Sequence, residues 1–419
     1  MKLKFSLLAL LSAFSLFCNG CTTEKTVVES QANQVQISFS WWGNDTRNEY
    51  TIAAIEKFEE LNPNIKVKCN YSEWSGYQAR NNVQMASNTE SDVMQINYAW
   101  INQYSPDGNG YYDINKLSDY VDFSNFQQSD LNFGMQNGKL NAIPIAYNTQ
   151  TIYFNKTIYD QYGLKLPKTW DDIFNAGKIM NGKNYPLSMA AKGAWFYCIS
   201  YAEQKTGKGF MNLKGDLQFN PDDIKIMLDF YCRLVNEKVM PNVESFDKLN
   251  ISSGDYAGVL AWLSDAKNYC DDAQKNSYDI QIGDYTAINK LDGWYIKPAT
   301  LYAISKNTDY PKESGMLLNY LLNSKEMAEY QGIEKGIPIS KAALTYLKEN
   351  SMLNGLQYDA YKQMDENKSQ LKMISPYFEN EELIDDFKSA CNDVLYNKAT
   401  SSDKASELYD TFNEVLIKN

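Results

Sequence analysis

The sequence contains no histidine at all. Serine–histidine and cysteine–histidine catalysis need an imidazole as general base, so both mechanisms are excluded. The commonest zinc and iron ligand sets lose their usual nitrogen donor for the same reason. Enzymes that use carboxylates alone, glycoside hydrolases above all, remain compatible with this composition.

Positive charge is scarce and scattered along the chain. There are 40 lysines and arginines against 52 aspartates and glutamates, which gives a net charge of −12, and only three residues are arginine. No lysine- or arginine-rich run is present. A nucleic-acid-binding protein takes most of its affinity from such basic surfaces, so we expect no nucleic-acid partner.

Long apolar runs are missing except at the start of the chain. Two lysines precede the apolar run Phe5–Phe17, and Gly20-Cys21 follows it. This run is too short to span a bilayer and resembles a bacterial lipoprotein signal. We expect residues 1–21 to be the signal peptide region, with Cys21 carrying the lipid, and the polar residues 22–34 to form a tether. An ordinary secretory signal is the alternative.

Cysteine is sparse beyond the signal region, and the number that remains is odd. The spacings match no metal-binding or redox motif, so we expect neither a metal site nor a cofactor. We interpret these thiols mainly as buried apolar residues, and a single Cys198–Cys232 bridge stays open as an alternative. The five residues are Cys69, Cys198, Cys232, Cys270 and Cys391.

What the sequence does contain is an alternation of strand-like and helix-like segments. A chain of 419 residues predicts two domains. The face formed by residues 35, 37, 39 and 41 predicts a strand, and residues 52–61 have helical spacing. Strands are also predicted over 65–71 and 92–97, with a helix between them. The fold class is therefore α/β, with a parallel sheet in the first third.

Tryptophans follow three successive predicted strands. The stretch SWWGNDTRNEY places Trp42 just after the first strand, while Trp74 and Trp100 follow the second and third. Ligands bind beyond the carboxyl ends of such strands, so these residues predict a binding site at one rim of the sheet.

A second unit follows residue 145. Thr169 and Asp172 predict a helix start, which makes Trp170 structural. Residues 258–265 predict a buried strand that runs into a helix, with Trp262 at the turn. From about residue 300 the chain has a helical pattern to its end.

Several segments, in this order and spacing, carry a resemblance to a known family. They are residues 41–43, 58–67, 91–96, 138–144, 153–156, 166–171, 297–298 and 336–340. On these residues the chain resembles the extracellular solute-binding proteins of ABC importers, in the carbohydrate-binding group that includes maltose-binding protein. Relatives often have an Arg-His pair where this chain has Arg47-Asn48, which leaves the identity of the ligand open.

The resemblance implies a periplasmic-binding-protein-like fold of two α/β lobes joined by hinge crossovers. We place the crossovers near 145–150, 297–301 and 335–340. Lobe 1 is then expected over 35–147 with 301–336, and lobe 2 over 150–297 with 340–419. The implied function is capture of an oligosaccharide between the lobes and its delivery to an ABC permease. It further implies a monomer with no catalytic residues, held by its lipid at the outer face of the cell membrane.

Sugars bind through stacked aromatic rings and through hydrogen bonds to their hydroxyls. The candidate platforms are Trp42, Trp74, Trp195, Trp262 and Trp294. The candidate hydroxyl partners are Asn44, Asp45, Arg47, Asn97, Asn148, Asp265 and Lys297. Arg47 matches a uronate carboxylate in geometry, or it pairs with Asp45 or Glu49 on its own helix.

Two other functional classes stay open from the sequence. One is a surface glycosidase, because adjacent acids occur at 59–60, 171–172 and 271–272, although neighbouring residues do not face each other. The other is a binder of peptides, polyamines or metal ions on the same fold. An aromatic-rich rim with few central carboxylates favours a sugar over these ligands.

Overall fold

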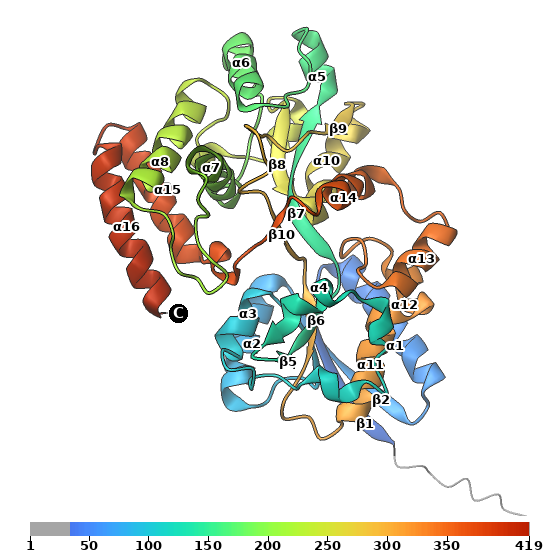
Figure 1. Ribbon diagram of the computed structural model, residues 1–419. Helices are drawn as coiled ribbons and strands as arrows, with labels where there is room; N and C mark the ends of the chain where they lie inside the picture. Colours follow the sequence, from blue (N-terminus) through green and yellow to red (C-terminus); the bar gives the residue numbers. More distant parts are fainter. Residues whose placement is uncertain (1–33, 419) are drawn as a thin grey trace, which may run out of the picture.

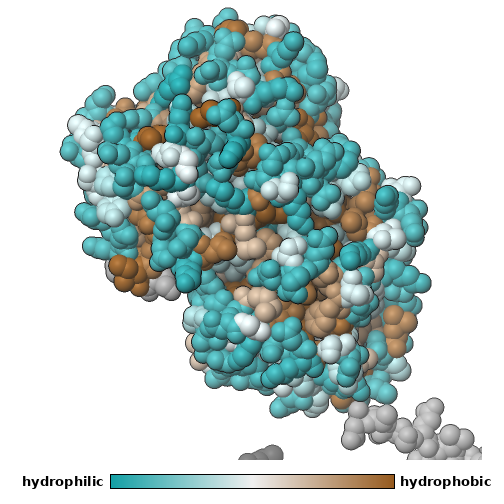
Figure 2. All heavy atoms as spheres, viewed as in Figure 1, coloured by the Kyte–Doolittle hydropathy of each residue, from teal (hydrophilic) through white to brown (hydrophobic). Residues whose placement is uncertain are grey.

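The computed structural model describes residues 34–418, which form two lobes connected by a narrow waist (Figure 1). The predicted signal region, tether and lipidated Cys21 lie outside the described residues. Hydrophilic side chains cover most of the face shown in Figure 2, and apolar atoms are visible at the waist. No helix within residues 34–418 combines the length and the apolar character needed to cross a membrane.

Lobe 1 is built on a five-stranded sheet in the order β2-β1-β3-β11-β6. Strand β1 pairs in parallel with β2 and β3, whereas β11 runs antiparallel to β3 and β6. Residues 37, 39 and 41 are buried on one face, as the alternation predicts. The strands are β1 (Val35–Trp42), β2 (Ile65–Ser72), β3 (Val93–Ile96), β6 (Ala142–Pro144) and β11 (Leu301–Ile304), and β4 (Met135–Gln136) pairs with β5 (Lys139–Leu140) in a separate hairpin.

Helices surround this sheet, and the sheet and helices together form the lower lobe in Figure 1. They are α1 (Asp45–Leu61), α2 (Trp74–Ser87), α3 (Ala99–Tyr104), α4 (Gln128–Leu131), α11 (Pro311–Asn323), α12 (Lys325–Gln331) and α13 (Lys341–Glu349). Short 3₁₀ turns also belong here: η1 (Ile114–Leu117), η2 (Phe123–Asn125) and η3 (Asn132–Gly134).

Lobe 2 has a sheet in the order β12-β10-β7-β8, with β9 paired to the far end of β7. Strand β7 is buried along its whole length and is antiparallel to β8, β9 and β10. The strands are β7 (Tyr147–Asn155), β8 (Gly258–Trp262), β9 (Ile280–Ile282), β10 (Tyr295–Pro298) and β12 (Lys372–Met373). The helices are α5 (Lys156–Gln161), α6 (Trp170–Met180), α7 (Ala191–Thr206), α8 (Pro221–Asn236), α9 (Leu249–Ser253), α10 (Ala266–Lys275), α14 (Gly355–Asn367), α15 (Glu381–Leu395) and α16 (Ser401–Lys418), with 3₁₀ turns η4 (Val243–Ser245), η5 (Leu263–Asp265) and η6 (Pro376–Glu379).

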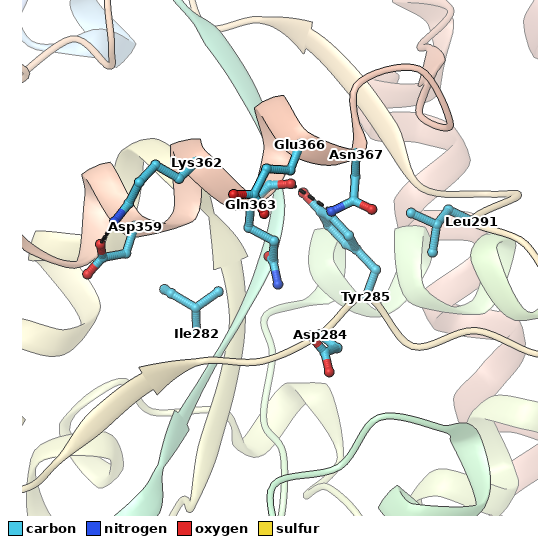
Figure 3. A pocket seen from close by; sticks show the side chains of 9 residues that line it. All are labelled: Ile282, Asp284, Tyr285, Leu291, Asp359, Lys362, Gln363, Glu366 and Asn367. Atoms are coloured by element: carbon cyan, nitrogen blue, oxygen red, sulfur yellow. Dashed lines mark hydrogen bonds and ion pairs between the residues drawn. The ribbon is translucent and has the colours of Figure 1, made fainter.

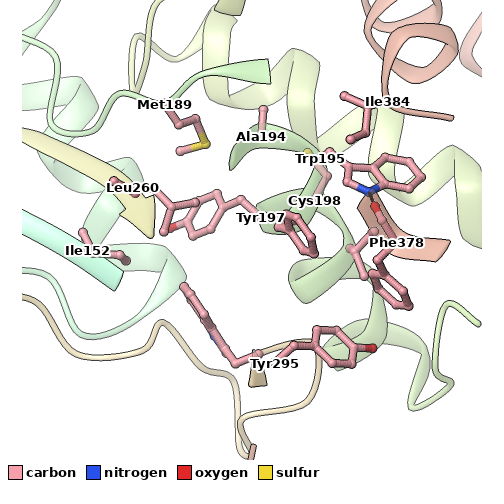
Figure 4. Packing of buried hydrophobic residues seen from close by; sticks show 14 of the residues in the cluster. Ile152, Met189, Ala194, Trp195, Tyr197, Cys198, Leu260, Tyr295, Phe378 and Ile384 are labelled. Carbon is pink, nitrogen blue, oxygen red and sulfur yellow. Dashed lines mark hydrogen bonds between the residues drawn. The ribbon is translucent and has the colours of Figure 1, made fainter. Parts of the chain in front are cut away.

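The core of lobe 2 surrounds the buried helix α7 (Figure 4). Thr169 and Asp172 form the predicted capping box at the start of α6, and Trp170 is 6% exposed, which confirms its structural role. All five cysteines within residues 34–418 are free, so the open Cys198–Cys232 bridge is absent. Cys198, like Cys270 and Cys391, is buried, as predicted.

Three chain segments lie side by side at the waist. The Ile145 N–H donates to the Thr300 carbonyl at 3.0 Å, and the Ile339 N–H donates to the Ile145 carbonyl at 3.0 Å. Gly336 has φ +102°, and a Cβ there would lie 2.8 Å from the Ala146 side chain. Glycine therefore lets the third segment approach the first, and the waist becomes a small hydrogen-bonded hinge.

The structure differs from two of the sequence-based expectations, one about a lobe boundary and one about secondary structure. Helix α13 packs on α12, with Ala343 and Leu347 in one cluster with Ala328, so it belongs to lobe 1. Residues 335–340 do contact the hinge, as expected, but the chain then stays in lobe 1 through α13. It returns to lobe 2 only between α13 and α14. The helical expectation from residue 300 is also wrong at first, because β11 fills a central, fully buried place in the lobe 1 sheet.

Candidate functional site

A cleft of about 930 Å³ lies between the lobes. It opens where β1, β2 and β3 end in lobe 1 and where β8 ends in lobe 2. The cleft thus lies at the rim of the sheet where the strand-end rule predicts a binding site. Its lining comprises Trp42, Asn44, Thr46, Arg47, Trp74, Asn97, Glu334 and Lys335 from lobe 1, Trp262, Ser264, Asp265, Lys267, Asn268 and Gln357 from lobe 2, and Ala299 and Thr300 from the hinge.

The lobe 1 wall carries a cluster of tryptophans. The rings of Trp42 and Trp74 lie 4.9 Å apart edge to face, and Trp74 stacks on Trp100 at 5.7 Å. Trp100 is buried beneath the other two, whereas Trp74 is 38% exposed. The predicted convergence of the three strand-end tryptophans is confirmed. Two of them present rings to the cleft, and the third supports them.

Gly43 and Asn44 determine the shape of the turn that follows β1. The Asn44 side chain accepts the Arg47 backbone N–H at 2.9 Å and caps helix α1. A Cβ on Gly43 would lie 2.6 Å from the Arg47 side chain. The glycine therefore allows the arginine stem to fold back over the turn, which aims its guanidinium along the cleft wall.

Arg47 does not pair with either acid on its own helix. Its Nη2 lies 2.8 Å from Oε1 of Glu334, and its Nε also donates to this carboxylate. The Tyr50 hydroxyl donates to the other oxygen at 2.6 Å. Burial alone would raise the pKa of Glu334, but the bonds from Arg47 and Tyr50 outweigh it and lower that pKa. Glu334 is therefore a fixed anion with both oxygens occupied.

Lys335 lies next along the chain and is only 3% exposed. Its ammonium donates to the Tyr302 hydroxyl at 2.8 Å. Burial and the nearby Arg47 charge hold the pKa of Lys335 well below its usual range, and Glu334 opposes them only in part. The wall of lobe 1 thus contains a buried amine without a carboxylate partner within the described residues.

The lobe 2 wall is formed by Trp262 and the η5 turn that follows it. The ammonium of Lys297 lies 4.3 Å from the Trp262 ring centroid, and the same group binds Glu379. Phe196 packs against the ring edge at 5.3 Å. Burial raises the pKa of Asp265, although Lys297, Arg47 and Lys248 oppose this shift.

Asn148 and Lys297 act behind this wall and do not line the cleft. The Asn148 amide donates to Ser264 Oγ at 2.9 Å and accepts the Ser264 N–H at 3.2 Å, which fixes the η5 turn. Both side chains were predicted to bind sugar hydroxyls. The structure places them as supports for Trp262 and for the turn, because both are almost fully buried.

Three further residues that were predicted to bind the ligand do not line the cleft. Trp195 is fully buried, donates its indole N–H to the Phe378 carbonyl at 2.9 Å and packs among phenylalanines (Figure 4). Trp294 is 2% exposed and donates to the Thr286 carbonyl. Asp45 is exposed in the first turn of α1, outside the cleft lining. The predictions that Trp195 and Trp294 are sugar platforms are therefore wrong.

Sequence reasoning missed Glu334, which pairs with Arg47, and the buried Lys335 beside it. The neighbouring Gly336, which the structure shows at positive φ, was the available signal that this segment has a constrained position. Lys267, Asn268 and Gln357 lie on helices and carried no recognisable pattern.

A second, more open cavity of about 520 Å³ lies on lobe 2, beside α14 (Figure 3). Two of the three carboxylates on its rim are already paired, since Asp359 binds Lys362 and Asp284 binds Lys168. No group of three acidic or cysteine side chains among residues 34–418 has an arrangement that would hold a metal ion.

Comparison with known proteins identifies the family. Residues 53–352 match the family of bacterial extracellular solute-binding proteins. An ABC transporter extracellular-binding protein of Pyrococcus horikoshii is 22% identical over 97% of this chain and 94% of that protein. The multiple sugar-binding protein of Streptococcus mutans is 25% identical over 46% of this chain and 44% of its own length. The chain belongs to the bacterial extracellular solute-binding protein family.

Solved structures agree with this assignment. A periplasmic solute-binding protein of Pectobacterium atrosepticum has a TM-score of 0.86 and 30% identity, over 92% of this chain and 99% of that one. The periplasmic oligogalacturonide-binding protein of Yersinia enterocolitica, in complex with saturated digalacturonic acid, has a TM-score of 0.82 and 30% identity over the same shares. The predicted two-lobed binding-protein fold is confirmed.

Proposed function

We propose that this protein captures an oligosaccharide in the interlobe cleft and delivers it to the permease of an ABC importer. The observation that carries the proposal is that tryptophans from both lobes, Trp42 and Trp74 on one side and Trp262 on the other, face one cavity. Aromatic faces cover the C–H surfaces of sugar rings, while amides and charged groups bind the hydroxyls. The cleft supplies both kinds of group.

The cleft volume and the relatives support an oligosaccharide as the ligand. Its volume of about 930 Å³ is near the upper end of ordinary ligand pockets, which is ample for more than one sugar ring. The Pyrococcus relative, which covers nearly all of this chain, is an extracellular-binding protein of an ABC transporter. The Streptococcus relative, which covers about half, is a sugar-binding protein, and the Yersinia neighbour binds an oligogalacturonide.

Transport requires the permease to distinguish the loaded protein from the empty one. A ligand shifts the balance between open and closed forms only by binding the closed form more tightly. Here the two walls belong to different lobes and the connecting hinge is narrow, so a sugar that touches Trp42 and Trp262 together favours closure. The closed, loaded monomer is then the form that the permease recognises.

Isothermal calorimetry against a panel of di- to tetrasaccharides tests the proposal, with small-angle scattering on each ligand that binds. We expect micromolar or tighter affinity for at least one oligosaccharide and a smaller radius of gyration in that complex. Release of reducing ends when the protein is incubated with these oligosaccharides would instead indicate a glycosidase. Thermal shifts with peptides, polyamines or metal ions alone would contradict the sugar assignment.

The chain start supports attachment to the membrane through Cys21. Lys2 and Lys4 precede the apolar run, and Gly20 stands before the cysteine. Each buried methylene of an acyl chain adds roughly 0.8 kcal/mol of membrane affinity, so a cysteine with several chains gives firm anchoring. Cys21→Ser is expected to release the protein from the outer face of the membrane into the medium. Unchanged membrane fractionation of this variant would contradict the anchor.

A further inference from the structure

The amides on the lobe 1 wall present free NH₂ groups to a ligand. The Asn44 side-chain oxygen accepts the Arg47 N–H at 2.9 Å, and the Asn97 side-chain oxygen accepts the Ala99 N–H at 3.0 Å. Each oxygen therefore already has one backbone donor. Neither NH₂ group has a hydrogen-bond partner among residues 34–418, so each amide can donate to a ligand.

The buried amine of Lys335 on the same wall lacks a carboxylate partner in the described part of the chain. Glu334 is the nearest carboxylate in the sequence, but Arg47 and Tyr50 occupy its two oxygens. Lys335 forms no ion pair with any residue between 34 and 418, and its one hydrogen bond goes to the neutral hydroxyl of Tyr302. A buried ammonium is stable only when an anion or several acceptors compensate it. An anion bound in the cleft would therefore stabilise the protonated form of Lys335.

The opposite wall also lies in a positive field. Lys297, Arg47 and Lys248 all act to lower the pKa of Asp265. On the other wall, repulsion from Arg47 exceeds attraction from Glu334 at Lys335. Asp265 on lobe 2 and Lys335 on lobe 1 thus both have cations as their strongest charged neighbours. Cations grouped in this way between low-dielectric walls attract an anion.

We propose that the ligand is an oligosaccharide with a carboxylate on its rings, as in uronic acids, and that this carboxylate binds the lobe 1 wall. There it accepts hydrogen bonds from Asn44 and Asn97 and neutralises Lys335. A carboxylate fits because it only accepts and carries the missing charge, whereas a sugar hydroxyl brings no charge. The inference rests on the proposed function and names the substrate class of the same cleft.

Esterification gives a matched pair of ligands for the test, because it removes the charge and keeps the rings and the linkage. Isothermal calorimetry compares digalacturonate with its dimethyl ester, and a glucuronate disaccharide with its methyl ester. We expect the better acid to bind at least tenfold more tightly than its ester. We also expect added salt to weaken binding of the acid more than binding of the ester.

Two variants locate the carboxylate. Lys335→Met removes the charge at similar length, and Asn44→Asp keeps the helix cap while it replaces the donor group by an acceptor. Each is expected to reduce the preference for acid over ester to less than threefold. The control is Lys290→Met, which removes an exposed lysine of lobe 2 that does not line the cleft. This control should change the preference by less than threefold.

The outcomes separate the two levels of the argument. Equal affinity for acid and ester, or an acid preference that survives in Asn44→Asp, overturns the uronate inference while oligosaccharide binding stands. If none of the acids, their esters or the neutral panel binds, the proposed function and the inference fail together. Asn44→Asp keeps the test decisive if Lys335→Met does not fold, since a melting curve checks each variant first.

Discussion

Trp262 and Trp195 have opposite roles in the structure, and replacing each by alanine should separate them. Trp262 lines the cleft at the end of β8, whereas Trp195 is fully buried in the lobe 2 core. Stacking a sugar on one ring removes about 100 Å² of apolar area from water, which is worth roughly 2.5 kcal/mol. Loss of the Trp262 ring should therefore weaken binding by roughly 60-fold.

Trp195→Ala should act on stability and only indirectly on binding. Large-to-small changes of buried tryptophan cost about 3–5 kcal/mol. In a lobe of this size each kcal/mol corresponds to about 2–4 °C, so the melting temperature should fall by roughly 10 °C. Trp262→Ala should lower it less, because its ring is only partly buried against Phe196 and Lys297.

Calorimetry with the best sugar and melting curves without ligand are needed for both variants. The expected pattern is a large affinity loss with a small melting change for Trp262→Ala, and the reverse for Trp195→Ala. A Trp262→Ala protein that binds sugar normally would refute the assignment of this ring as a platform. Equal stability losses in the two variants would refute the distinction between the cleft and the core.

Three further changes probe the supports of the site. Because the pKa of Glu334 is lowered in the folded protein, its contribution to stability is present above its unfolded pKa near 4.3 and is lost as the pH falls through the lower folded pKa. Glu334→Gln should thus melt lower than the wild type at pH 7, and the two should converge only when the pH is below that folded pKa. Gly336→Ala puts a Cβ 2.8 Å from Ala146 at positive φ, so its melting temperature should fall by several degrees, and an unchanged melt would contradict the hinge geometry. Asn148→Ala frees the Ser264 turn and should weaken sugar binding several-fold, whereas unaltered calorimetry would show that the turn holds itself.

The elements around the site were predictable because their signals are local. Alternation over β1 and the strand-end rule were enough to predict that Trp42, Trp74 and Trp100 share one rim of the sheet. Thr169 and Asp172 likewise marked a helix start through the hydrogen bonds that they make within four residues. Each of these predictions depends either on contacts between residues close together in the sequence or on the general rule for where parallel strands end.

The failures depend on contacts between distant segments. Nothing near Trp195 in the sequence says that Phe378 will accept its indole N–H across 183 positions. The partner of Arg47 lies 287 residues away, so the nearer acids on its own helix were the natural but wrong choice. Strand β11 was missed because four apolar residues have no period that separates a buried strand from a helix.

The position of the charged groups also determines which lobe drives closure. Glu334, Lys335 and Gly336 are consecutive, so the anion-deficient part of the cleft lies beside the hinge itself. Groups near a pivot move little when two lobes rotate, and contacts to them are similar in the open and closed forms. They can raise affinity for both forms, but only differential contacts shift the balance between the forms. If the protein closes on a sugar as proposed, those differential contacts must come from groups farther from the hinge, such as Trp262 and Asp265 on the lobe 2 wall.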